Sequence, residues 1–153
     1  MIKYRFKKSP DYSKKDLLEI IEKLDSYFVP SLSDRVDLLE YTDKLDEYSN
    51  VIMAYNEESN PIGLIAFYDN DTQTKNGFIT LLGILDGYQG QGIASSFIDY
   101  CLYESRLNGI ERIEVKTELD NTGAISLYKK KDFEEVGLLQ EHNVQKIKFK
   151  RNI

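Results

Sequence analysis

The sequence has no long hydrophobic run, no excess of basic residues and only one cysteine. No stretch approaches the roughly 18 consecutive apolar residues that a membrane helix needs, and residues 1–8 lack the apolar core of a secretion signal. We therefore expect a cytoplasmic protein with no membrane partner. A lone cysteine excludes an internal disulfide, and the apolar residues at helical spacing around Cys101 predict a buried thiol.

The charge balance argues against nucleic acid as a partner. The 153 residues include 20 Lys and Arg against 26 Asp and Glu, which gives a formal net charge of −6. A protein that neutralises the phosphates of nucleic acid needs an excess of basic residues. The length is that of one ordinary domain, so we expect a single domain over residues 1–153, as a monomer or a homodimer.

Hydrophobic periodicity predicts strands and helices along the whole chain. Apolar runs predict strands at residues 2–6, 51–55, 62–68, 78–85, 110–117, 133–139 and 144–150. Helical spacing predicts helices that begin at Ser13, near Ser33, after the glycines at 87–92 and at residues 120–122. The order β, α, α, β, β, β, α, β, α, β, β predicts an α/β protein. Its mixed sheet is mostly antiparallel, contains a parallel crossover and is flanked by helices.

The segment from Gly83 to Ser95 is the most informative part of the chain. An apolar strand breaks into three glycines and restarts as an amphipathic helix. Glycines allow positive φ and a close backbone approach, and the amides of a first helical turn have no partner within the helix. Such a junction is suited to hold phosphate, so we expect main-chain amides to bind a phosphate group there. The residues concerned are Gln89, Gly90, Gln91, Gly92, Ile93, Ala94 and Ser95.

The glycine loop does not match the two common nucleotide-binding motifs. A dinucleotide fingerprint needs glycine at the third place of its motif, where this chain has Ser95. A Walker A loop needs Lys after its last glycine, and Gly92 is followed by Ile93. Clustered glycines most often form a plain tight turn. Two glycines would suffice for such a turn, whereas this loop has three.

The predicted order of strands and helices, together with two motifs, resembles the GNAT superfamily of acetyl-CoA dependent N-acetyltransferases. The likeness covers most of the chain. The first is the pyrophosphate loop, Gln89-Gly90-Gln91-Gly92-Ile93-Ala94. The second is Asn121, Ala124, Leu127-Tyr128 and Asp132-Phe133. Two positions depart from the family pattern, which often has Pro in place of Asp86 and usually Gly in place of Asp132. Asp tolerates the left-handed conformation expected at the second position, so the fold is not in doubt.

The resemblance implies acetyl-CoA as co-substrate and no metal ion. In such proteins the pantetheine arm lies between two splayed parallel strands, here 78–85 and 110–117. Ile84 and Leu85 would then offer main-chain groups, and the Ile84 amide could stabilise the developing oxyanion. Asn121 either binds the cofactor arm or caps its helix. Gly83 indicates a bulge, a close backbone approach or simple packing.

The resemblance also places Tyr128 beside the reacting sulfur. A phenol is protonated at neutral pH and can protonate a departing thiolate. The base that deprotonates the amine stays open among Glu118, Tyr68 and Asp69, and His142 is set aside because it lies in a predicted polar turn. We expect the acceptor between the loop at 27–32 and the final hairpin.

The predicted function is transfer of acetyl from acetyl-CoA to a primary amine of a small molecule by direct attack. Two alternatives remain open. One is acetylation of a protein or peptide amine or an amino sugar, and the other is a non-catalytic module that senses acyl-CoA.

Overall fold

A single seven-stranded sheet, in the order β1-β2-β3-β4-β5-β7-β6, organises the computed structural model, which describes residues 1–153. The pair β4 and β5 is parallel and every other neighbouring pair is antiparallel. The predicted mixed α/β sheet with one parallel pair is therefore confirmed. The strands are β1 (Lys3–Phe6), β2 (Asn50–Tyr55), β3 (Pro61–Tyr68), β4 (Asn76–Ile84), β5 (Arg112–Glu118), β6 (Glu134–Glu141) and β7 (Val144–Asn152).

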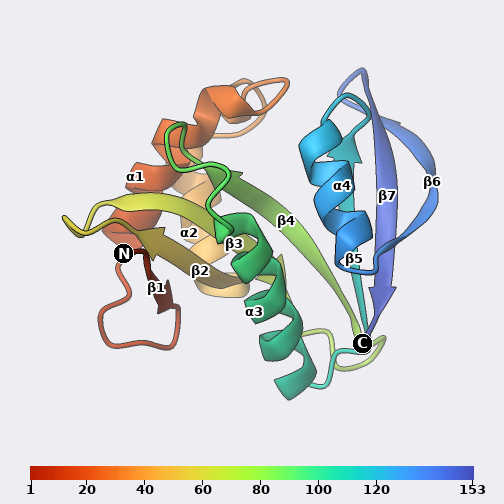
Figure 1. Cartoon of the computed structure of the whole chain (residues 1–153), viewed down its shortest axis with the longest axis horizontal. Coiled ribbons are helices and arrows are strands. Elements are labelled where there is room, and N and C mark those ends of the chain that lie inside the picture. The colour runs from red at the N-terminus through yellow and green to blue at the C-terminus, as the bar shows by residue number, and fades with distance from the viewer.

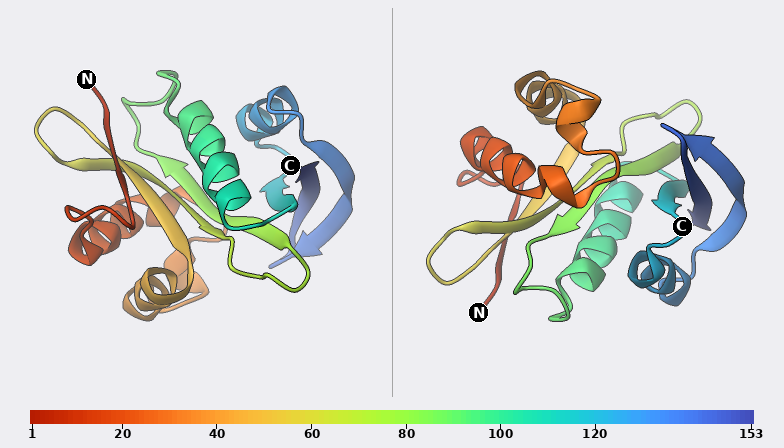
Figure 2. Two further views of the ribbon diagram at one scale, coloured as in Figure 1. Left: turned by 90° about the horizontal axis from the view of Figure 1, so that it is seen from below. Right: turned by 90° about the horizontal axis from the view of Figure 1, so that it is seen from above.

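Four α-helices cover the sheet on both faces, as Figures 1 and 2 show. Helices α1 (Lys14–Leu24) and α2 (Leu38–Tyr48) lie on one face, with the short 3-10 helices η1 (Asp25–Tyr27) and η2 (Leu32–Asp34) between them. Helices α3 (Ile93–Leu107) and α4 (Thr122–Lys130) lie on the other face. None of these helices combines the length and the apolar character needed to cross a membrane.

Strand alternation divides the core into two layers. In β2, Val51 and Met53 pack with the buried residues of α1, whereas Ile52 and Ala54 pack with those of α3. Period-two alternation sends successive side chains to opposite faces, and here both faces are apolar because both are covered. Strand β2 is consequently buried along its whole length, and β3 is buried except at Tyr68.

Several element boundaries differ from the predicted ones by a residue or more, and two of these differences have a clear local cause. The second helix begins at Leu38 rather than near Ser33, because the Asp37 carboxylate accepts the amide of Glu40 at 3.0 Å and caps it. Strand β5 begins at Arg112 rather than Ile110, because the Ile110 amide donates to the Ser105 carbonyl at 3.0 Å and still belongs to the end of α3.

A bulge in β4 separates two halves of this strand. Ala66 of β3 pairs with Leu81, but its neighbour Phe67 pairs with Ile79, so Thr80 is an extra residue. The parallel ladder between β4 and β5 ends at the same place, with Ile79 opposite Val115. Beyond this point the two strands diverge (Figure 1). The space between them positions the candidate site.

Candidate active site

A cavity of about 610 Å³ opens where β4 and β5 diverge, and we call it the cofactor-side cavity. Its walls are the second half of β4, the glycine loop, the first turn of α3, the end of β5 and helix α4. Cavities of roughly 300 to 1,000 Å³ are typical of small-molecule sites. The lining includes most of the residues predicted to bind cofactor: Ile84, Gln89, Gly90, Gly92, Ile93, Ala94, Ser95 and Asn121.

The glycine loop presents a row of unused amides to this cavity. The first hydrogen bond of α3 runs from the Ser96 amide to the Gly92 carbonyl at 3.0 Å. No amide from Gln89 to Ser95 donates to a protein acceptor. Gly90 and Gly92 have φ of 78° and 81°, and an added Cβ at either would project into open space. The backbone thus has the geometry of an anion cradle at a helix N-terminus.

Glutamine side chains hold the loop in this shape. The Nε2 of Gln89 donates to the Ile84 carbonyl at 3.0 Å, and the Nε2 of Gln91 donates to the Gly87 carbonyl at 3.4 Å. Gln91 itself does not line the cavity. The Asp86 amide donates to the Tyr27 hydroxyl at 2.9 Å, a bond that proline at this position could not make.

Of the two predicted main-chain partners, the structure places Ile84 in the cavity and Leu85 outside it. The Leu85 amide donates to the Ile62 carbonyl of β3 at 2.9 Å, and its side chain packs on the α1 face. Since amides alternate in direction along an antiparallel strand, the Ile84 amide points away from β3, toward the gap beside β5. Ile84 is therefore the residue of the two whose N–H can reach a ligand.

Gly83 serves packing rather than a bulge. A Cβ built on Gly83 would lie 2.8 Å from Cδ1 of Leu24, a fully buried residue of α1. The glycine thus lets α1 approach β4 closely on the face opposite the cofactor-side cavity. The bulge predicted as one possibility at Gly83 lies instead at Thr80.

Asn121 caps α4 at the edge of the cavity. Its Oδ1 accepts the Ala124 amide at 3.1 Å, which leaves its Nδ2 without a protein acceptor. The capping alternative is therefore observed, and the Nδ2 remains free to donate to a bound molecule.

Tyr128 is fixed at the inner wall of the cofactor-side cavity. Helix α4 ends in a Schellman motif, in which the Phe133 amide donates to the Tyr128 carbonyl at 2.9 Å and Asp132 adopts φ 65°. The predicted left-handed Asp132 is thus confirmed. The Tyr128 ring packs against Phe133 at 5.4 Å and against Phe149 at 5.9 Å between ring centroids.

The environment of Tyr128 keeps its phenol protonated. Only 3% of the residue is exposed, and burial raises its pKa well above the ordinary value, with further contributions from Cys101 and Glu118. No protein group forms a hydrogen bond with its hydroxyl. The side chain is therefore a neutral donor held beside the cavity. Cys101 is fully buried and burial raises its pKa strongly, which makes the thiol inert.

The three open candidates for the base lie in different places. Glu118, at the end of β5, lines the cofactor-side cavity with Tyr128. Asp69 is buried elsewhere, where its carboxylate accepts the side-chain amides of Asn50 at 3.1 Å and Asn108 at 2.7 Å. Tyr68 stacks on Phe78 with ring centroids 4.8 Å apart and lines neither cavity.

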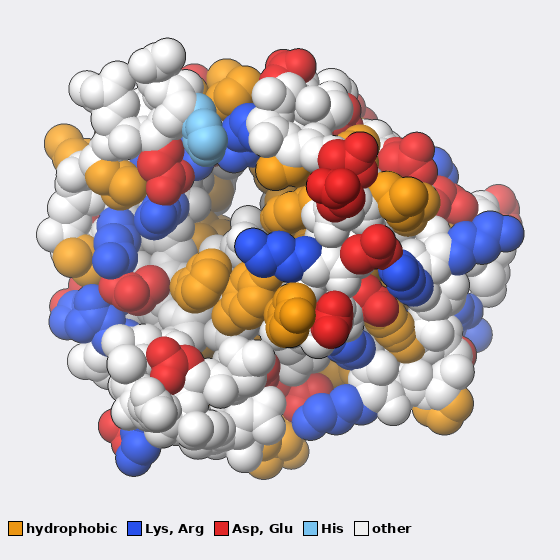
Figure 3. Space-filling view, turned by 180° about the vertical axis from the view of Figure 1, so that it is seen from behind, with side chains coloured by type: hydrophobic (Ala, Val, Ile, Leu, Met, Phe, Trp, Pro, Cys, Tyr) orange, Lys and Arg blue, Asp and Glu red, His pale blue; other side chains and the backbone are white.

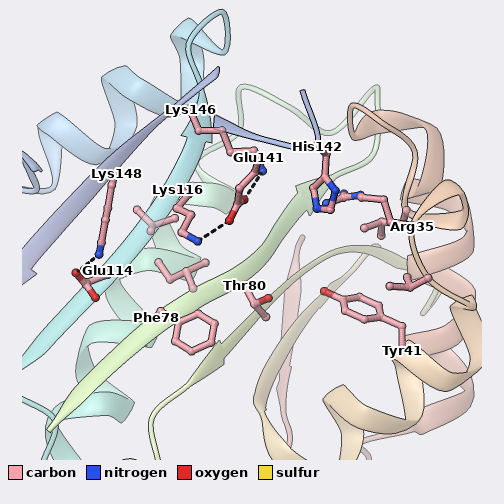
Figure 4. Close-up of a pocket in the computed structure, with 14 residues that line it drawn as sticks. Arg35, Tyr41, Phe78, Thr80, Glu114, Lys116, Glu141, His142, Lys146 and Lys148 are labelled. Atoms are coloured by element: carbon pink, nitrogen blue, oxygen red, sulfur yellow. Dashed lines mark hydrogen bonds and ion pairs between the residues drawn. The ribbon is translucent and has the colours of Figure 1, made fainter. Parts of the chain in front are cut away.

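A second cavity of about 550 Å³ lies on the α1 and α2 side of the same gap, and we call it the acceptor-side cavity. The loop that follows η2 and the β6–β7 turn converge on it, the latter with Glu141 and His142 (Figure 4). The space-filling view shows the surface hollowed beside this histidine (Figure 3). The two cavities adjoin at the gap, where five residues line both of them: Ile79, Thr80, Val115, Lys116 and Lys146.

The acceptor-side cavity is lined by ion pairs that the sequence pattern did not predict. Glu141 binds Lys116 at 2.7 Å and Lys146 at 3.2 Å. The hydrogen bond from Lys116 is the main reason that the pKa of Glu141 lies below its usual range. Glu114 pairs with Lys148 and with Arg112, both at 2.9 Å. The only available signal was the spacing of Lys146 and Lys148, which places both on one face of a strand.

Comparison with known protein families identifies the class to which this chain belongs. The model of the Acetyltransferase (GNAT) family matches residues 16–133, and the chain belongs to this family. N-alpha-acetyltransferase 30 of Schizosaccharomyces pombe is 37% identical over 60 residues, which is 39% of this chain and 40% of that protein. N-alpha-acetyltransferase MAK3 of Arabidopsis thaliana is 34% identical over 56 residues, 37% of this chain and 30% of that protein. The chain thus matches less than half the length of these curated relatives.

Solved structures share the fold over the whole chain. The yncA protein of Salmonella typhimurium, solved with its cofactor acetyl-CoA, superposes with a TM-score of 0.79 at 16% identity. The match covers 99% of this chain and 93% of that one. At this identity the likeness establishes the fold, and the site must be argued from the residues of this chain.

Proposed function

We propose that this protein transfers the acetyl group of acetyl-CoA to a primary amine of a small molecule by direct attack. The observation that carries the proposal is the gap at Thr80, where the cavity of the glycine loop and Tyr128 adjoins a second cavity across the sheet. Two reactants can thus meet from opposite faces without a covalent enzyme intermediate.

The cofactor-side cavity fits the chemistry of acetyl-CoA. The unused amides from Gln89 to Ser95 suit the pyrophosphate, with the partial positive charge of the α3 N-terminus behind them. The Nδ2 of Asn121 and the main chain of Ile84 suit the amide-bearing arm. When bound, acetyl-CoA supplies a thioester whose carbonyl carbon is open to attack.

The residues of the gap then have separable tasks. The nitrogen of a neutral amine forms a bond to the carbonyl carbon, and the carbon–sulfur bond breaks. The Ile84 amide stabilises the negative charge that develops on the carbonyl oxygen. Tyr128 donates its proton to the departing sulfur, and the proton lost by the amine passes to Glu118 directly or through water.

The acceptor-side cavity supports a small molecule. Its volume of about 550 Å³ lies within the range of small-ligand sites. Transfer to the α-amine of a protein is the second candidate, favoured by the names of the two curated relatives. A cytoplasmic location is part of the proposal.

Calorimetry with acetyl-CoA, followed by release of free thiol with a panel of amines and N-terminal peptides, tests the proposal. We expect binding at physiological salt and thiol release that depends on an amine of the small-molecule set. Absence of binding would refute it. Binding without thiol release for any acceptor would support a sensor module, and release with peptides alone would support the second candidate.

Replacement of Tyr128 by Phe tests the acid. Because the ring packing is kept and only the hydroxyl is lost, we expect kcat to fall about a hundredfold or more while the Kd of acetyl-CoA stays nearly constant. Tyr103→Phe, at an exposed position of α3, is the matched control. An unchanged kcat in Tyr128→Phe would remove the acid role.

A further inference from the structure

Arg35 stands out among the residues of the acceptor-side cavity because its charge is unpaired. It lies between η2 and α2, and its side chain extends across the cavity toward His142 of the β6–β7 turn (Figure 4). Its Nε is buried and has no hydrogen-bond partner. No carboxylate forms an ion pair with it. A buried donor without an acceptor is uncommon and costs free energy unless a ligand satisfies it.

The other charges of this cavity do not neutralise Arg35. The two carboxylates that line the cavity already have two cationic partners each. Glu141 pairs with Lys116 and Lys146. Glu114 pairs with Lys148 and Arg112. The lining holds Arg35, Lys116, Lys146 and Lys148 against these two carboxylates, a formal excess of two positive charges. The whole chain, in contrast, has a net charge of −6. The cavity is therefore a local positive site on an acidic protein.

We propose that the acceptor is a small primary amine that also carries an anionic group, a carboxylate or a phosphate, which Arg35 binds. This inference rests on the proposed function and names its substrate class. A guanidinium offers planar paired donors that match two oxygens of either anion. With the anion at Arg35, the amine end extends toward the gap at Thr80.

The same charge excess acts on the amine itself. Nearby positive charges disfavour an ammonium ion and lower the pKa of a bound amine. Lys116 and Lys146 line both cavities, so both lie close to the gap where the proposed reaction takes place. The cavity therefore favours the neutral amine, which is the form that attacks, while it attracts the anionic end of the same molecule.

Matched acceptor pairs test the inference. One pair is β-alanine and β-alanine amide, and the other is phosphoethanolamine and ethanolamine, so that each pair isolates one anion. We expect kcat/KM of the wild-type protein to be about tenfold or more higher for the anionic member of at least one pair, which identifies the anion. Arg35→Gln should lower kcat/KM for that member about ten- to a hundredfold and leave the neutral member nearly unchanged.

Two further variants serve as controls. Arg35→Lys keeps the charge but loses the paired donors, so an intermediate loss is expected. Lys44→Gln removes one positive charge from an exposed position of α2 outside both cavities. It should leave kcat/KM unchanged for both members of the pair. Calorimetry with acetyl-CoA confirms that each variant is folded.

The failures of the two proposals can be told apart. Equal use of neutral and anionic members by the wild type, or an equal loss for both members in Arg35→Gln, would overturn the anionic acceptor and leave acetyl transfer standing. Transfer to no amine at all would overturn both.

Discussion

At the scale of single residues, backbone conformation matters as much as side-chain chemistry. Asp132 has no role in the proposed reaction, yet its positive φ closes the Schellman motif that turns Phe133 against Tyr128. This gives a physical reason why Leu-Tyr and a following Phe at fixed spacing form a motif. The phenol is held by a contact two residues past the helix cap, and its position does not depend on a hydrogen bond of its own.

Gly92 and Gly109 allow a matched test of the anion cradle. They flank α3, have the same φ of 81°, and have open space where a Cβ would be. Valine at either position should lower the free energy of unfolding by about 1–2 kcal/mol, because the left-handed conformation is strained for a residue with a Cβ. Only Gly92→Val should weaken the binding of acetyl-CoA, with a Kd raised at least about tenfold, which corresponds to about 1.4 kcal/mol.

Urea unfolding and calorimetry check both parts of this prediction. If Gly109→Val weakened acetyl-CoA binding as much as Gly92→Val does, the cause would be general destabilisation, and the assignment of the anion cradle would fail.

At the scale of elements, the sequence predicted most of what local physics determines. The order of strands and helices and the start of α1 at Ser13 follow from periodicity and capping, and the structure confirms them. The anion cradle could be predicted for the same reason, since a strand, three glycines and a helix are contiguous in the chain.

Features that depend on distant segments were not predictable in this way. The Lys116–Glu141 pair joins β5 to β6, and Arg35 meets the β6–β7 turn only because η2 and that turn lie on the same side of the sheet. The local pattern around His142 predicts only an exposed polar turn, but this turn closes the acceptor-side cavity. The bulge at Thr80 has no signature in its apolar strand. The single domain over residues 1–153 and the oligomeric state stay predictions.

The contact between α1 and β4 is the element-level feature most open to a stability test. Gly83→Val would bring new atoms against Leu24, which is fully buried, and should cost about 1–3 kcal/mol. Leu24→Ala alone should cost about 2–5 kcal/mol. The double variant should cost less than the sum, because the cavity left by leucine accepts the new side chain.

Urea unfolding of the double-mutant cycle measures this coupling. Gly137→Val on β6, where the added side chain meets nothing, serves as the control. If the changes in the free energy of unfolding were strictly additive, the contact with Leu24 would not be what restricts the size of the side chain at position 83.

At the scale of the whole molecule, buried and partly buried tyrosines shape the response to alkaline pH. Burial raises the pKa of the tyrosines at 12, 41, 55, 68 and 128 above the ordinary value of about 10. Since the folded chain retains protons that the unfolded chain releases, their stabilisation is complete below about pH 10 and is lost as pH rises above it.

We therefore expect the free energy of unfolding to fall above about pH 10, by up to about 1.4 kcal/mol per pH unit for each such tyrosine. Urea unfolding at a series of pH values between about 8 and about 11 measures the slope. Tyr128→Phe should have a shallower slope than Tyr103→Phe, in which an exposed tyrosine is lost. A constant stability across this range would contradict the prediction.

The extra residue Thr80 shifts the alternation of side chains along β4 by one position. Before Thr80 the strand sends Phe78 to the acceptor side, and after it Leu81 and Gly83 face α1 while Leu82 and Ile84 face α3. Deleting Thr80 would remove the bulge and leave these faces unchanged, because residues 78, 79, 81 and 82 would then alternate regularly. The gap at which we propose the reaction thus lies at one extra residue in the backbone of β4, where the parallel ladder with β5 ends.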